Sequence, residues 1–248
     1  MNGRLLDNRQ SGGRSRTSHA QVVDELGKAI VAGAFPIGSI LPGDSELLQR
    51  FKVSRTILRE SMKTLAAKGM VVPRARVGTR VTEKIHWNMF DNEVLSWHFE
   101  NGVDQEFLLH LYDIRIAFEP FAAGLVAERA SKEDIDLLRR LAAALANPEH
   151  TSDSLAVADL HFHLAITEAS QNPFMRSLGG LIEAALVGMF RMSAPPASSG
   201  FGNIAETHTA IVDAIAARDS AGARRAMEFV IIDGKQHVLE AFAALAET

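Results

Sequence analysis

Residues 41–81 constrain the fold more than any other part of the chain. Within them, Ser54 supplies a natural N-cap for a helix that is expected to end at Gly69, a residue suited to the position after a helix. The apolar residues that follow alternate around Gly78 and predict a two-stranded hairpin. An amphipathic helix expected over 19–34 precedes this stretch. This order of elements predicts a winged helix-turn-helix.

The helix that begins after Ser54 carries arginines where a recognition helix contacts bases. Arg55 and Arg59 are one turn apart on one face, and arginine can donate two hydrogen bonds to guanine O6 and N7. Thr56 can contact a phosphate or a thymine methyl group, whereas Lys63 and Lys68 are expected to contact solvent or phosphate. The alternative is a solvated helix face without a partner. The expected contacts to double-stranded DNA are Ser54, Arg55, Thr56, Arg59, Arg74, Arg76, Gly78 and Thr79.

Charge and composition agree with a DNA-binding first third. Residues 1–85 carry 15 Lys/Arg against 7 Asp/Glu, a net charge of +8, whereas residues 86–248 carry 11 against 23, a net charge of −12. Such asymmetry favours a polyanion-binding module joined to another domain, although a chance surface bias is the alternative. The chain has no cysteine, which excludes disulfides and thiolate sites. Without a secretory signal or an apolar run of about 20 residues, a cytoplasmic protein without a membrane partner is expected.

Beyond Glu83 the apolar periodicity is helical almost throughout and predicts an antiparallel helical bundle, so the expected fold class is mainly α. The expected helices cover about 87–100, 104–130, 132–146, 153–171, 173–192, 203–218 and 220–246. The expected domains are a flexible N-terminal arm (1–18), a winged helix-turn-helix (19–84), a linker helix (85–103) and a helical domain (104–248).

The N-terminal motifs resemble a known family. The chain reads Gly38-Ser39-x-Leu41-Pro42, Val53-Ser54-Arg55-Thr56, Arg59-Glu60, Leu65-x-x-x-Gly69 and Gly78-Thr79-x-Val81. These residues resemble the DNA-binding domain of GntR-type transcription regulators. Ser45 departs from the pattern, because many relatives carry a DNA-contacting arginine at this position. The resemblance therefore implies an operator that differs accordingly.

A second group of motifs lies in the acidic helical domain. Asp159 and His163 are four residues apart, so they share a helix face and can hold one metal ion, whereas His161 is expected to point away. Together with Asn172-Pro173 and Glu206-Thr207-His208, this pattern resembles the FCD effector domain of the FadR branch of the GntR family.

This second resemblance implies a metal site. In that family an aspartate and three histidines commonly bind a divalent metal, which helps to hold a small carboxylate effector. Asp159, His163 and His208 match three of these positions, and Val230, which cannot ligate, stands at the fourth. A three-ligand site is therefore expected, with zinc as the expected ion. The alternative is a buried polar cluster that hydrogen bonds and water satisfy.

The resemblance also implies an effector contact in the first helix of the domain. Relatives often hold the effector carboxylate with an arginine at the position of Arg115, and Asp113 is expected to bond a hydroxylated ligand or to orient Arg115. A surface pair between Arg115 and Glu119 is the alternative. Residues 87–97 resemble the linker of regulators that respond to sugar acids such as galactonate, which favours a sugar-acid effector.

Taken together, the two resemblances imply a bacterial transcription regulator that is not an enzyme. A homodimer is expected to repress from a palindromic operator and to be released when the helical domain binds a small organic acid. A metal-dependent, hydrolase-like enzyme would leave the basic N-terminal domain unexplained. A DNA-binding protein without an effector is the other alternative, and it would bind DNA with an affinity that no small acid changes.

Overall fold

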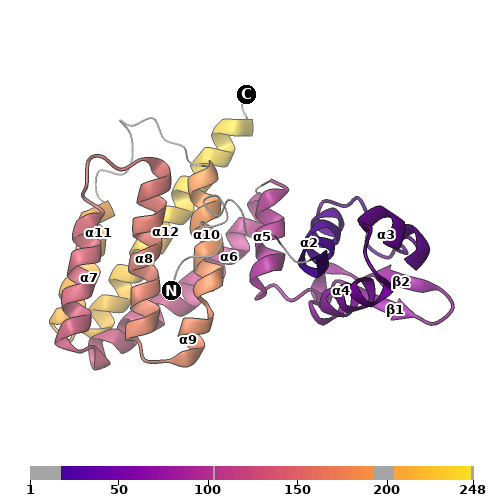
Figure 1. Cartoon of the computed structure of the whole chain (residues 1–248). Coiled ribbons are helices and arrows are strands. Elements are labelled where there is room, and N and C mark those ends of the chain that lie inside the picture. The colour runs from indigo at the N-terminus through magenta and orange to yellow at the C-terminus, as the bar shows by residue number, and fades with distance from the viewer. Residues whose placement is uncertain (1–17, 103, 193–203, 247–248) are drawn as a thin grey trace. The chain divides into compact units, whose positions relative to one another are not determined.

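The computed structural model describes residues 18–102, 104–192 and 204–246 (Figure 1). Up to Gly102 these residues form one compact unit, and from Asp104 onward they form another. The arm expected over 1–18 lies outside the described residues except for Ser18, where the first described helix begins. The mainly α fold class is confirmed, because helices dominate both units and the sheet of the described chain has only two strands. None of the described helices has the length and apolar character needed to span a membrane.

The N-terminal unit is a winged helix-turn-helix with an additional helix. Its elements are α2 (Ser18–Val31), α3 (Asp44–Phe51), α4 (Arg55–Ala67), β1 (Val71–Arg74), β2 (Gly78–Val81), the 3-10 turn η1 (Lys84–His86) and α5 (Asn92–Glu100). Helix α4 begins where expected, because the Ser54 hydroxyl accepts a hydrogen bond of 3.3 Å from the Ile57 amide. Gly69 follows its end with φ +77°, and a Cβ there would collide with the His86 carbonyl oxygen. Only glycine fits that position without strain.

The wing is attached to the rest of the unit by backbone hydrogen bonds. Strands β1 and β2 pair antiparallel, with Val71 opposite Val81 and Arg74 opposite Gly78. The segment before α3 pairs with the other edge of β2, since the Leu41 amide donates to the Thr79 carbonyl oxygen at 2.8 Å. The hairpin is therefore held on both edges of β2.

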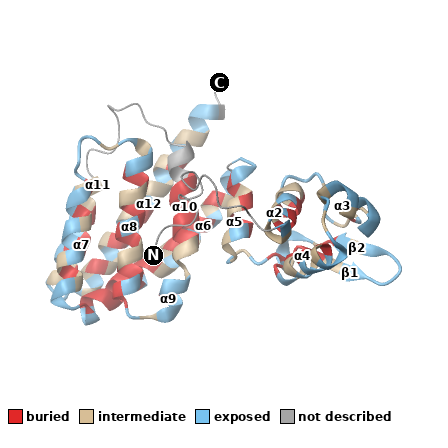
Figure 2. Cartoon of the chain, viewed as in Figure 1, coloured by how far each residue is buried: buried red, intermediate tan, exposed pale blue. Residues whose placement is uncertain are grey.

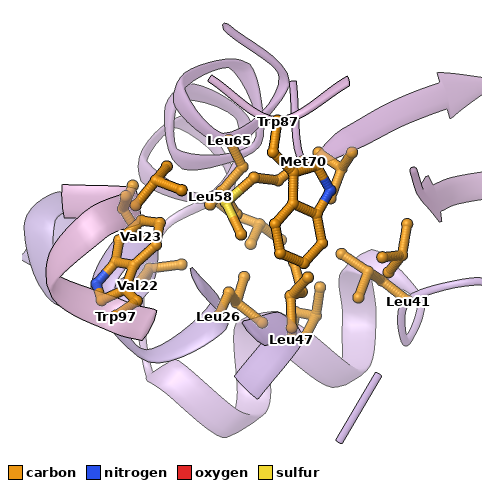
Figure 3. Packing of buried hydrophobic residues seen from close by; sticks show 14 residues of the cluster. Val22, Val23, Leu26, Leu41, Leu47, Leu58, Leu65, Met70, Trp87 and Trp97 are labelled. Atoms are coloured by element: carbon orange, nitrogen blue, oxygen red, sulfur yellow. The ribbon is translucent and has the colours of Figure 1, made fainter. Parts of the chain in front are cut away.

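A single apolar cluster joins the helices and the wing of this unit. Figure 3 shows Leu26, Leu47, Leu58 and Met70 packed in its interior, with the Trp97 ring beside Val22. These apolar side chains are at most 2% exposed. Burial of this kind supplies most of the stability of a small domain.

Helix α5 is fixed to the N-terminal unit by a buried cation, which corrects the expectation for Lys68. Its ammonium group is not a solvent or phosphate contact but lies 2.6 Å from Asp91 Oδ2 and 2.7 Å from Glu93 Oε2, with its side chain only 9% exposed. At the other end, the Trp97 indole donates to Asp24 Oδ1 of α2 at 2.9 Å. The indole ring packs against Gly27 of α2, where a Cβ atom would collide with the ring.

The C-terminal unit is a bundle of helices. Its elements are α6 (Gln105–Arg129), α7 (Lys132–Ala144), α8 (Ser152–Ala169), α9 (Pro173–Ser177), α10 (Gly179–Met192), α11 (Ile204–Ala216) and α12 (Ser220–Ala246). Helix α8 packs against α6, α7 and α10, and α12 lies along α6. Buried residues face the interior of the bundle (Figure 2). The site described below is built from inward-facing residues of α6, α8 and α11.

Two expected helices differ from those observed. The segment expected as one helix over 173–192 is divided at Leu178 into α9 and α10. Gly179 and Gly180 directly follow the division, and glycine is a poor helix former that weakens a continuous helix there. The helix expected to begin at 87 begins at Asn92, because the Asp91 side chain caps it by accepting from the Glu93 and Val94 amides.

Replacing Lys68 with methionine should destabilise the N-terminal unit by about 2 kcal/mol, because the partly buried Asp91 carboxylate loses its cation, whereas the exposed Glu93 carboxylate adds little. Urea unfolding followed by tryptophan fluorescence measures this directly, since both tryptophans of the chain, Trp87 and Trp97, belong to this unit. The matched control is Lys63→Met, which removes a 2.8 Å pair with Glu60 between largely exposed side chains. Equal unfolding midpoints for the two variants would contradict this account of Lys68.

Candidate functional site

The exposed face of α4 carries the residues expected to contact DNA. Arg55, Thr56 and Arg59 are all exposed, whereas Leu58 and Leu65 on the opposite face are buried in the apolar cluster. The Ser54 side chain is occupied as the N-cap of this helix. The structure therefore brings a rigid, cationic helix end to the surface, with the arginine side chains available to a partner.

The wing presents a second set of cations. Arg74, Arg76 and Gly78 are exposed, and Thr79 is half-buried. Arg76 has φ +62° at the tip of the hairpin, a backbone conformation that is unusual for a residue with a side chain. Arg80 differs from its neighbours, because its Nε atom donates to the Gly38 carbonyl oxygen at 2.8 Å. Arg80 therefore braces the wing.

In the C-terminal unit the structure brings Asp159, His163 and His208 together. Each offers a ligand atom, these atoms lie within 4.8 Å of one another, and all three residues are buried. Asp159 Oδ1 is 2.9 Å from His208 Nε2 and 3.6 Å from His163 Nε2. Two ligands of a tetrahedral zinc ion with bonds near 2.0 Å are about 3.3 Å apart, so the observed distances bracket the required one.

The other nitrogen of each histidine is already occupied. His163 Nδ1 contacts the Glu119 carboxylate in a short hydrogen bond, and His208 Nδ1 donates to the Ile204 carbonyl oxygen at 2.7 Å. A hydrogen bond from Nδ1 fixes the tautomer in which Nε2 keeps its lone pair, as is usual for metal-binding histidines. When the histidines are neutral, the Nε2 lone pairs are therefore available as metal ligands beside Asp159.

Two candidate metal-ligand atoms of this cluster lack hydrogen bonds. Asp159 Oδ1 and His208 Nε2 are buried and have no hydrogen-bond partner among the described residues, although they lie close together. Unsatisfied buried polar atoms are costly, and they are rare unless a water or an ion completes them. One carboxylate oxygen and two imidazole nitrogens suit zinc and related divalent ions. The residues present therefore fit a metal ion.

Arg115 and Glu119 of α6 adjoin this cluster. Their side chains are only 3% and 2% exposed, and Arg115 Nε is 2.5 Å from Glu119 Oε1. The pairing that was the alternative for Arg115 therefore exists, but it is buried and not on the surface. Arg115 Nη2 also lies 3.5 Å from His163 Nε2. The guanidinium group thus stands beside the proposed ligand atoms in a region from which water is largely excluded.

The charges of the cluster set its protonation. Burial alone would raise the pKa of Glu119, but the Arg115 and His163 cations lower it to about 2. Burial would lower the pKa of His163, but the carboxylates of Glu119 and Asp159 raise it to about 9. The pKa of the Asp159 carboxyl is likewise held well below its usual range, because the two histidines outweigh the effect of burial. Without a metal, His163 is therefore a cation at neutral pH.

Several residues considered from the sequence lie away from this cluster. Asp113 is on the exposed side of α6, where it pairs with Lys235 of α12 at 2.7 Å, and His161 is exposed on α8. His237, seven residues after Val230 and a histidine that could be weighed as a substitute ligand, has a side chain that is 41% exposed and lies 3.6 Å from Asp233. Val230 is half-buried in α12 and offers no ligand atom.

Sequence reasoning placed Glu119 in a surface pair and assigned no role to Tyr112, although both are buried in or beside the cluster. Both share the face of α6 that carries Arg115, since they stand four residues after it and three before it. Their spacing from Arg115 was the available signal, because it places them on the same helix face. The length and apolar character of α6 favour burial of that face, whereas a charged pair four residues apart is more typical of a helix surface.

The comparisons with known proteins agree with this division of the chain. Residues 18–81 match the family described as bacterial regulatory proteins, gntR family, and residues 110–231 match the FCD domain. A relative from Escherichia coli (strain K12), described as an uncharacterized HTH-type transcriptional regulator YieP, is 34% identical over 85% of this chain and 90% of its own length. The galactonate operon transcriptional repressor of the same organism is 28% identical over 89% of this chain and 96% of its own length.

A solved structure supports the same fold. It is described by the words "Lar controls the expression of the Listeria monocytogenes agr system and mediates virulence", and it aligns with a TM-score of 0.61. The alignment covers 92% of this chain and 99% of the other at 18% identity, so it is evidence for the fold alone.

Zinc binding to the cluster should strengthen as pH rises. A metal-binding nitrogen must be unprotonated, so Zn²⁺ has to displace the proton that His163 holds with a pKa of about 9. We expect the apparent Zn²⁺ affinity to increase about tenfold per pH unit from about pH 7 until this proton is gone. Competition with a chelator at several pH values measures the slope.

Two histidines of α8 supply the matched variants for that titration. His163→Ala should abolish tight Zn²⁺ binding, and His161→Ala, on the exposed face, should leave it unchanged. Equal affinities in both variants, or an affinity independent of pH, would rule out this cluster as the zinc site.

Proposed function

The chain belongs to the GntR family of bacterial regulatory proteins and carries an FCD domain, and from this premise we propose that it is a repressor which a small organic acid releases from its operator. It acts as a homodimer in the cytoplasm, on a palindromic operator whose half-sites are spaced by the two recognition helices. A divalent metal, zinc by preference, helps to hold the acid.

The N-terminal unit supports the DNA-binding half of the proposal. Arg55 and Arg59 stand exposed on one face of α4, with the cations of the wing on the same unit. A capped helix fixes the backbone positions from which both arginines can reach guanine edges. Backbone bonds on both edges of β2 keep the wing in place beside them. The wing arginines then supply contacts to phosphate or a groove.

The observation that carries the effector half is the buried donor set of Asp159, His163 and His208 next to Arg115. A bound divalent ion would add two positive charges to a cluster in which Glu119 already neutralises Arg115 and Asp159 supplies one negative charge, which leaves one positive charge. A carboxylate at the metal and the guanidinium group would offset that charge, and a planar guanidinium suits a carboxylate. The bound anion would therefore be a small organic acid.

A sugar acid is the preferred effector within this class. A relative is named a galactonate operon repressor and covers nearly the whole of both chains, and residues 87–97 resemble the linker of such regulators. A metal-dependent hydrolase is not favoured, because the relatives are regulators and the N-terminal unit is built for DNA. An effector-independent DNA-binding protein is distinguished by the second experiment below.

Arg59→Ala should weaken binding to a specific operator by about 1–3 kcal/mol and relax the preference at one base pair of each half-site, because one bidentate contact is lost. Lys63→Ala should weaken specific and non-specific DNA by the same small factor, since it contributes charge alone. Fluorescence anisotropy with operator and scrambled duplexes at fixed salt separates the two effects. If Arg59→Ala binds the operator as the wild type does, the base contact is assigned wrongly.

Small acids should stabilise the zinc-loaded protein and release it from DNA. An acid at 100 times its dissociation constant adds about 2.7 kcal/mol to the unfolding free energy. A thermal-shift screen of sugar acids, with D-galactonate first, and of hydroxy and dicarboxylic acids measures the gain, and a gel-shift assay measures release. Arg115→Lys keeps the charge but loses the planar fork, so it should lose most of the response. Operator binding indifferent to every acid would favour the effector-independent alternative.

A further inference from the structure

We propose that Tyr112 is a ligand-binding residue of the FCD domain, and that its hydroxyl donates a hydrogen bond to an oxygen atom held at the Asp159, His163 and His208 site. This oxygen belongs either to a carboxylate or to a water molecule on the metal. The inference rests on the proposed metal and acid site and adds a contact that governs affinity for the acid.

The placement of Tyr112 on α6 directs it toward this site. Tyr112, Arg115 and Glu119 follow one another at three and four residues, so they share one face of the helix. The guanidinium carbon of Arg115 lies over the Tyr112 ring at 5.4 Å from its centroid. Arg115 in turn contacts His163. The tyrosine is therefore part of the same buried layer as the ligand atoms.

The Tyr112 hydroxyl has no acceptor for its proton in that layer. The residue is 0% exposed, and its hydroxyl proton has no acceptor among the described residues, because its neighbour Arg115 can only donate. Within this cluster, Asp159 Oδ1 and His208 Nε2 also lack hydrogen-bond partners, and both are proposed ligand atoms. Buried tyrosine hydroxyls usually find a partner, so one left without it beside other unsatisfied atoms indicates a missing ligand.

The chemistry of the neighbours defines what the ligand must bring. Arg115 can only donate hydrogen bonds, so it cannot accept the phenolic proton. The Glu119 carboxylate is occupied by Arg115 and His163. Asp159 Oδ1 is an acceptor of the same cluster, but the hydroxyl makes no hydrogen bond to it. An anionic oxygen brought by a ligand at the metal would supply the acceptor that the hydroxyl lacks. Arg115 and Tyr112 would then contact the same acid from α6.

The sequence offers a direct probe, because Tyr112 is the only tyrosine of the chain. Full-length protein labelled with 3-fluorotyrosine gives a single fluorine resonance, which reports this hydroxyl without assignment. We expect the resonance to shift when Zn²⁺ is added, and to shift again when acetate or D-galactonate is added to the zinc-loaded protein. A resonance that moves with neither addition would overturn the proposal.

Tyr112→Phe removes the hydroxyl and leaves the ring in place. Cobalt-loaded protein allows both steps to be followed by visible absorbance, first Co²⁺ uptake and then acetate binding. The variant should take up Co²⁺ as the wild type does but bind acetate about tenfold more weakly, because one hydrogen bond to the anion is lost. Its melting temperature without metal should be unchanged or higher, because the lost hydroxyl has no acceptor in the metal-free protein. Loss of a structural hydrogen bond would instead lower the melting temperature.

The outcomes separate this inference from the proposed function. Equal acetate affinity in Tyr112→Phe and wild type, with normal Co²⁺ uptake, would overturn the role of Tyr112 and leave the metal and acid site intact. A metal-free variant that melts well below the wild type would assign the hydroxyl a structural role instead. Failure of the wild type to take up Co²⁺ would overturn the metal site and this inference together.

Discussion

Glu119 is the group on which the buried cluster of the C-terminal unit depends, because it is the partner of both Arg115 and the Nδ1 atom of His163. By accepting from Nδ1 it leaves Nε2 of His163 directed toward Asp159. By pairing with Arg115 it allows a guanidinium group to be buried next to a candidate metal site, where an isolated cation would be very costly. One carboxylate thus orients a ligand atom and compensates a charge.

The two units use charge in opposite ways. In the N-terminal unit the arginines of α4 stand in solvent, where they retain their freedom to contact a polyanion and contribute little to stability. In the C-terminal unit Arg115 and His163 are buried, so each must be satisfied by a specific partner. Exposed cations suit a surface that binds and leaves DNA reversibly. Buried ones suit a site that must distinguish one small anion from another.

Local sequence patterns predicted most helices and strands correctly, but they did not predict which side chains are buried by contacts with distant parts of the chain. The capping role of Ser54 and the shared face of Asp159 and His163 follow from helix geometry, so the spacing alone indicates them. The burial of Lys68 and Glu119 does not, because it depends on which helices pack together and not on the residues beside them. The break at Leu178 was missed for a similar reason, since helical periodicity continues across the glycines that interrupt it.

The attachment of α5 to the DNA-binding helices limits where this DNA-binding unit can be joined to another effector domain. Lys68 with Asp91, and Trp97 with Asp24, hold α5 against the DNA-binding helices, so the compact unit ends at Gly102 and not at the end of the wing. A chimera joined after Gly102 would transfer a complete reader to a new effector domain. A junction placed near residue 85 would separate the buried Lys68 ammonium from Asp91 and Glu93, and α2 from the indole that covers Gly27. Exchange of sensing domains is therefore confined to a short window of the chain.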